Sequence, residues 1–220
     1  MDINSIGARL TAIMVTLSAT VYLINIPLIL ALAAKDLGLT QTAPLWLGGV
    51  FLGGVALAMS LSTLFIFLVS WRSLICISGI MGLMSFALPT LVSGFTFLLV
   101  CQGLAGFFVG TSCAVAITCL GASLNPIRSY ALILSLQAGA VALAAYLLPP
   151  LNAEKINFND ALISASCVCL VLVILSRMMP TGLKIGRVKF FVDDERKALV
   201  FFALLAVLLI FFGGNIVRGT

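Results

Sequence analysis

Four polar side chains lie in otherwise apolar stretches of this sequence and are its best candidates for contacting a polar group on a small molecule. They are Tyr22, Asn25, Gln102 and Gln137. A phenol or an amide in hydrocarbon needs a hydrogen-bond partner or water, so each must meet another helix, a cavity or a ligand. We therefore predict that these four residues bind substrate. Hydrogen bonding between packed helices is the alternative, and the sequence leaves it open.

The first apolar stretch carries its polar residues on one side. Thr11, Ser18, Tyr22 and Asn25 are separated by seven, four and three positions, which places them on one helical face. We expect this face to point at other helices or at a cavity, where it would form a wall of a substrate path. Pro27 cannot donate its backbone hydrogen bond and should kink this helix.

Enzymatic chemistry has little support. The sequence contains no histidine, and its six cysteines fall inside apolar tracts without a C-x-x-C pair, so the usual metal, haem and hydrolytic sites cannot be assembled. We expect no catalytic residues, no metal, no cofactor and no enzymatic activity.

Composition indicates a membrane protein. Apolar residues make up 62% of the 220 positions and charged residues 9%, and the mean hydropathy is +1.26, whereas soluble domains have about a quarter of their residues charged. The net charge of +5 is scattered between apolar tracts, so no nucleic-acid partner is expected. At about 20 residues per crossing, the chain is expected to be an all-α integral membrane protein with six to seven transmembrane helices in the lipid bilayer.

The expected organisation is a six-helix bundle over residues 1–178, a charged cytoplasmic linker and a seventh transmembrane helix. Its spans are residues 10–34, 45–70, 73–92, 95–120, 130–149 and 158–176, followed by the linker at 179–197 and the seventh helix at 198–216.

The distribution of basic residues predicts the orientation, because short cytoplasmic loops are enriched in Lys and Arg. With a cytoplasmic N-terminus, nine basic residues lie inside, and Lys35, Lys155 and Arg218 lie outside. The inner residues are Arg9, Arg72, Arg128, Arg177, Lys184, Arg187, Lys189, Arg196 and Lys197. We expect a multi-pass protein of the cell inner (plasma) membrane.

Small residues predict close contacts between helices. Gly49 and Gly53 in the second span, and Gly106 and Gly110 in the fourth, are each separated by three residues, a spacing that lets helix backbones approach. Gly103 extends the small face of the fourth span, so we expect these five glycines at helix–helix contacts.

Short motifs resemble the major facilitator superfamily of transporters. The run at 99–106, Leu-Val-Cys-Gln-Gly-Leu-Ala-Gly, resembles the superfamily's fourth-helix motif, in which Arg precedes two residues and Gln-Gly, with Leu99 at the arginine position. The segment 34–40 resembles its first outer loop, and the charged connection after the sixth span resembles its central loop. The resemblance covers roughly residues 10–216 and implies an N-terminal half bundle of that fold.

The superfamily's signature turn between its second and third helices is largely replaced. Thr63, Phe67, Leu68 and Ser70 stand where its Gly, Asp, Arg and second Gly would fall, and Arg72 remains. The resemblance implies that Arg72 is a remnant of a cytoplasmic gate.

The resemblance also implies a function. Transporters of this kind hold substrate between two six-helix halves, so we expect a permease or half permease for a small solute that needs a second half or a homodimer for activity. The sequence does not identify the solute. The alternatives are a non-catalytic six-helix substrate-capturing or accessory subunit of a larger membrane complex, and a non-transporting remnant.

Overall fold

The computed structural model describes residues 6–38, 42–66, 69–92, 94–123, 125–147 and 157–182. Helices contain 89% of these residues, and none of them is in a strand. Contacts divide the chain into a unit Met1–Leu183 and a unit Lys184–Thr220, and every described residue belongs to the first. Most of the expected linker and all of the expected seventh helix lie outside the described residues.

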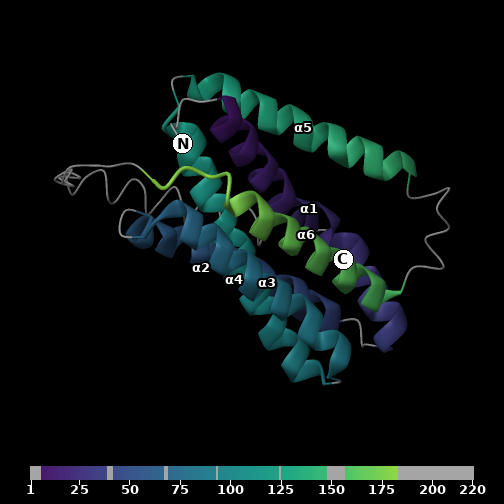
Figure 1. Ribbon diagram of the computed structural model, residues 1–220. Helices are drawn as coiled ribbons and strands as arrows, with labels where there is room; N and C mark the ends of the chain where they lie inside the picture. Colours follow the sequence, from purple (N-terminus) through teal and green to yellow (C-terminus); the bar gives the residue numbers. More distant parts are fainter. Residues whose placement is uncertain are drawn as a thin grey trace, which may run out of the picture. The chain divides into compact units, whose positions relative to one another are not determined.

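The described chain forms six helices (Figure 1). They are α1 (Ile6–Leu37), α2 (Ala43–Phe65), α3 (Trp71–Leu91), α4 (Phe95–Gly121), α5 (Pro126–Leu147) and α6 (Phe158–Ser176). Each of the six expected spans overlaps one of them.

Five of these helices are long and apolar enough to cross a membrane: α1, α2, α3, α4 and α6. Helices can span bilayers because their backbone groups hydrogen-bond to one another, whereas hydrocarbon offers no hydrogen-bond partners. The chain is therefore an all-α membrane protein. Helix α5 occupies the place of the expected fifth span but is not among the five, so its crossing stays a prediction.

The break between α2 and α3 falls earlier than the sequence suggested. The second span was expected to reach Ser70, but α2 ends at Phe65 and α3 begins at Trp71 rather than at position 73. The reason is a helix cap. Ser70 has an extended backbone, and its Oγ accepts a hydrogen bond from the backbone N–H of Ser73 at 3.2 Å, which satisfies one of the free donors at the start of α3.

The helix pairs that pack together form a regular set. They are α2 with α4, α1 with α5, α3 with α4, α1 with α6, α1 with α2, α4 with α5, α3 with α6, and α1 with α4. If α1 and α4 exchange labels, and likewise α2 with α5 and α3 with α6, the same list of pairs results. The described bundle can thus be divided into two three-helix units, α1–α3 and α4–α6, whose corresponding helices have corresponding neighbours.

The two units differ in how tightly their second helices pack. Helices α2 and α4 share the most extensive contact, whereas the equivalent pair α5 and α1 touches slightly. In Figure 1, α5 lies at one edge of the described bundle, close to α1 near the start of both helices and away from it further along.

Glycine allows the tight contact of α2 with α4. A Cβ at Gly106 would overlap the carbonyl oxygen of Phe51, and a Cβ at Gly54 would overlap that of Gly103. Gly49 and Gly53 had also been expected at helix–helix contacts, but among the described residues a Cβ at either would have no neighbouring atom within 4 Å. Because the helix turns through about 100° per residue, Gly54, one position further on than Gly53, is the glycine that faces α4.

The remaining glycines expected on α4 lie against α2. A Cβ at Gly103 would stand 3.0 Å from Val50 Cγ1, and a Cβ at Gly110 would stand 2.9 Å from Val55 Cα. Because Gly103, Gly106 and Gly110 follow one another at intervals of three and four, they form one continuous face towards α2.

Candidate functional site

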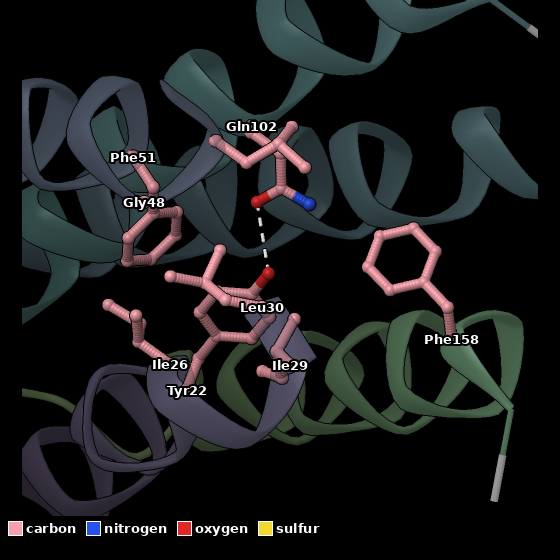
Figure 2. Close-up of a pocket in the computed structure, with 9 residues that line it drawn as sticks. Tyr22, Ile26, Ile29, Leu30, Gly48, Phe51, Gln102 and Phe158 are labelled. Atoms are coloured by element: carbon pink, nitrogen blue, oxygen red, sulfur yellow. Dashed lines mark hydrogen bonds between the residues drawn. The ribbon is translucent and has the colours of Figure 1, made fainter. Parts of the chain in front are cut away.

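A hydrogen bond between Tyr22 and Gln102 joins α1 to α4 inside the bundle. The Tyr22 hydroxyl donates to Gln102 Oε1 at 3.0 Å, and the two side chains are 8% and 3% exposed. Figure 2 shows the phenol and the amide meeting between their helices, with Phe51 on one side and Phe158 on the other. The structure thus brings together two of the four predicted binding residues.

Aromatic rings hold Tyr22 in place. Its ring centroid lies 4.6 Å from that of Phe51 on α2 and 4.6 Å from that of Phe86 on α3. Next to the Tyr22–Gln102 pair is a cavity of about 10 Å³, which has room for about one water molecule. Among the described residues, this cavity beside Gln102 is therefore too small to hold a substrate.

A much larger cavity of about 390 Å³ lies between α1 and α6. Phe86 from α3 and Val109 from α4 complete its lining. Ser18, Tyr22 and Asn25 all line it from α1. At these three positions, the predicted polar face of α1 therefore faces a cavity. Tyr22 lines both the small and the large cavity.

Gln137 lies apart from the other predicted binding residues. Its Nε2 donates to Thr20 Oγ1 at 3.2 Å and links α5 to α1. Thr20 is two residues from Tyr22, about 200° around the helix, so this link is on a different face of α1. Gln137 lines neither of the two cavities. In this conformation it acts as a cross-link between helices.

Two polar residues of α6 that were not among the predicted binding residues, Asp160 and Ser164, also line the larger cavity. Asp160 forms a capping box at the start of α6, in which its Oδ2 accepts from the backbone N–H of Asn157 at 3.2 Å. The spacing of Asn157 and Asp160 could have revealed this cap. It could not have revealed the cavity, because the opposite wall belongs to α1.

The start of α6 is fixed to the end of α1 by a second carboxylate. Asp36 Oδ2 accepts from the backbone N–H of Phe158 at 2.5 Å. A carboxylate at a helix N-terminus is favoured by the free N–H groups and by the helix dipole. This contact sets α1 and α6 antiparallel and places Asp160 at the end of the cavity near the last turn of α1.

Arg72, the expected gate remnant, links two segments by a hydrogen bond. Its Nε donates to the backbone oxygen of Met179 at 2.9 Å, which connects the start of α3 to the segment after α6. The adjacent Trp71 is buried and donates its Nε1–H to the Ile66 backbone oxygen at 3.0 Å. These two bonds hold together the turn between α2 and α3 and the end of α6.

These features define the class of the protein: a helical membrane protein with an elongated, partly polar cavity between two of its helices. Among the described residues, no group of three or more His, Cys, Asp or Glu side chains could hold a metal ion. No protein-family model matches the chain, and no curated protein matches its sequence.

Proposed function

We propose that the chain is a major-facilitator-like permease half of the inner (plasma) membrane, with a cytoplasmic N-terminus. It carries a small solute together with a second half, supplied by another copy or by a partner.

The observation that carries this proposal is the equivalence of α1–α3 and α4–α6 in their packing partners. If α5 crosses as predicted, each unit crosses the bilayer three times, so the two units have opposite orientations. Inverted repeats of this kind are the building blocks of many secondary transporters, which place substrate near the bilayer midplane where repeats meet. The Tyr22–Gln102 bond joins the first helices of the two units, and this polar contact between them supports the proposal.

The charge pattern and the polar cavity wall also support the proposal. Basic residues favour one side of the predicted spans, and the short motif around Gln102 resembles the fourth helix of the superfamily.

The assembly can be tested by expressing two copies with different tags and isolating the protein through one of them. We expect the second copy, or a different membrane protein with about six spans, to be recovered, and native mass spectrometry to give the stoichiometry. A monomer that transports solute by itself would refute the need for a second half. Stable association with a protein of another class, without solute flux, would instead identify an accessory subunit.

The transport activity needs a separate measurement, because the solute is unknown. Small-molecule contents of cells with and without the protein can be compared by mass spectrometry, with Asn25→Leu as the test variant and Gly53→Ala as its control. We expect the content of at least one solute to change with the wild-type protein and Gly53→Ala, but not with Asn25→Leu. Equal contents in all four cell lines would contradict the proposal.

A further inference from the structure

We propose that the cavity between α1 and α6 binds an elongated amphipathic amine, with its apolar body along α1 and its protonated amino group at Asp160. This inference concerns binding alone, so it stands whether or not the chain transports a solute.

The dimensions of the cavity suit an elongated molecule. Its volume of about 390 Å³ lies within the range of about 300–1,000 Å³ that is usual for small-molecule sites. Its lining extends along α1 from Ser18 to Leu32, a distance of about 21 Å at the helical rise of about 1.5 Å per residue.

Most of the cavity wall is apolar. Leu28, Ile29 and Leu32 line it from α1, and Val168 and Leu172 line it from α6. Burial of a hydrocarbon body against these side chains is favourable in proportion to the apolar surface that leaves water. A fully polar ligand such as a sugar would leave most of its hydroxyl groups without partners here.

The polar groups of the wall offer hydrogen-bond acceptors. Asn25 Nδ2 donates to the backbone oxygen of Val21 at 2.8 Å, so its Oδ1 keeps its lone pairs for the cavity. Ser164 Oγ donates to the backbone oxygen of Ala161 at 2.7 Å and can likewise accept a further bond. No described side chain donates to either oxygen, so a ligand with N–H groups would complement this wall.

Charge favours an amine over other donors. Asp160 is the one charged side chain among the described residues that line the cavity, and its second carboxylate oxygen is not used by the capping bond to Asn157. An ammonium group supplies a positive charge and up to three N–H donors. Asp160 is exposed at the end of the cavity, and the attraction between two charges near a protein surface still exceeds its value in bulk water.

Two kinds of molecule carry this chemistry: a free amphipathic amine, and a phospholipid with a primary amine in its headgroup. Both present an apolar chain and an ammonium group.

The test uses the purified full chain in a non-ionic detergent and two photoreactive probes of equal chain length, an alkylamine and the corresponding alkyl alcohol. We expect the amine to label residues of α1 and α6 that line the cavity, with about tenfold more product than the alcohol. Unlabelled dodecylamine should compete with it, and dodecanol should not. Equal labelling by the two probes would overturn the proposal.

Two charge-neutralising variants form a matched pair. Asp160→Asn keeps an oxygen that can cap α6 but removes the charge in the cavity, so labelling by the amine should fall about tenfold. Asp36→Asn keeps an oxygen that can accept the Phe158 N–H and removes a carboxylate outside the cavity lining, so it should leave labelling unchanged. Unchanged labelling of Asp160→Asn, or an equal loss in both variants with circular dichroism still native, would contradict the assignment to Asp160.

Native mass spectrometry of the protein isolated in gentle detergent distinguishes the two sources. Retention of an aminophospholipid by the wild-type protein, and its loss from Asp160→Asn, would identify the occupant as a membrane lipid. Wild-type protein that carries no such lipid but is labelled selectively by the amine probe would identify a free amine as the ligand.

Discussion

The phenol of Tyr22 and the amide of Gln102 satisfy one another inside an apolar bundle. Each would be costly to bury alone, because hydrocarbon supplies no hydrogen-bond partner. Their bond crosses from α1 to α4 at 3.0 Å, and the rings of Phe51 and Phe86 flank the phenol. The pair therefore contributes to the alignment of α1 with α4 as well as to the polarity of the site.

A double-mutant cycle on this pair should show coupling. Tyr22→Phe leaves Gln102 Oε1 without its donor, and Gln102→Leu leaves the Tyr22 hydroxyl without its acceptor, so each single change should lower the free energy of unfolding by about 1–3 kcal/mol. We expect a coupling energy of about 0.5–1.5 kcal/mol, as for other hydrogen bonds between membrane helices. Unfolding of the purified protein in mixed detergent and SDS micelles measures these differences.

Thr111→Val is the control for this cycle. Its hydroxyl bonds to the backbone oxygen of Phe107 in its own helix at 2.9 Å, so its removal should change the free energy of unfolding by less than about 0.5 kcal/mol. Additive effects of the Tyr22 and Gln102 changes would mean that the two side chains do not depend on one another.

Among the helix pairs, α2 and α4 approach most closely because glycines on both helices face the partner backbone. Between apolar helices in lipid, such close packing provides much of the attraction, since lipid chains are as apolar as leucine and the hydrophobic effect is weak. The equivalent pair α1 and α5 has a less extensive contact, and the Gln137–Thr20 bond joins it instead.

Alanine substitutions should distinguish the contacting glycines from the others. Gly106→Ala forces its Cβ against the carbonyl oxygen of Phe51, so the free energy of unfolding should fall by about 1–3 kcal/mol or more. Gly53→Ala meets open space and should be neutral or stabilise the helix by up to about 1 kcal/mol. Thermal denaturation in detergent measures both variants, and equal destabilisation by the two changes would contradict this packing of α2 on α4.

In the described part of the molecule, the position of α5 in the membrane determines whether the two three-helix units are inverted repeats. Five other helices are long and apolar enough to cross, and α5 lies between α4 and α6 in the chain. If α5 crosses, the residues before and after it lie on opposite sides of the bilayer. If α5 lies on the surface, those residues share one side.

Cysteine accessibility can determine these sides. In a variant without the native cysteines, we expect a membrane-impermeant thiol reagent to label Thr42→Cys and Asn157→Cys in intact cells. Ser70→Cys and Asn125→Cys should react after permeabilisation alone, because basic residues favour the cytoplasmic side. Labelling of Asn125→Cys and Asn157→Cys from the same side would show that α5 does not cross. The two three-helix units would then not be inverted repeats.

The sequence by itself determined that the chain is helical and belongs in a membrane. Its apolar tracts reach the length of a bilayer crossing, and a helix is the one spanning structure that satisfies its own backbone within a single segment. It also determined which face of α1 is polar, because Ser18, Tyr22 and Asn25 recur at helical spacing. These properties depend on residues that are close together in the chain.

The tertiary structure alone decided which of these faces meet. Tyr22 finds Gln102 across 80 positions, Gly54 rather than Gly53 meets α4, and Asp160 joins the wall opposite Asn25. Hydropathy could not specify these pairings, because a membrane helix can be apolar towards lipid and towards its neighbours alike. The rotation of each helix is set by the fit of its side chains against the helices around it, and that fit exists only in the assembled bundle.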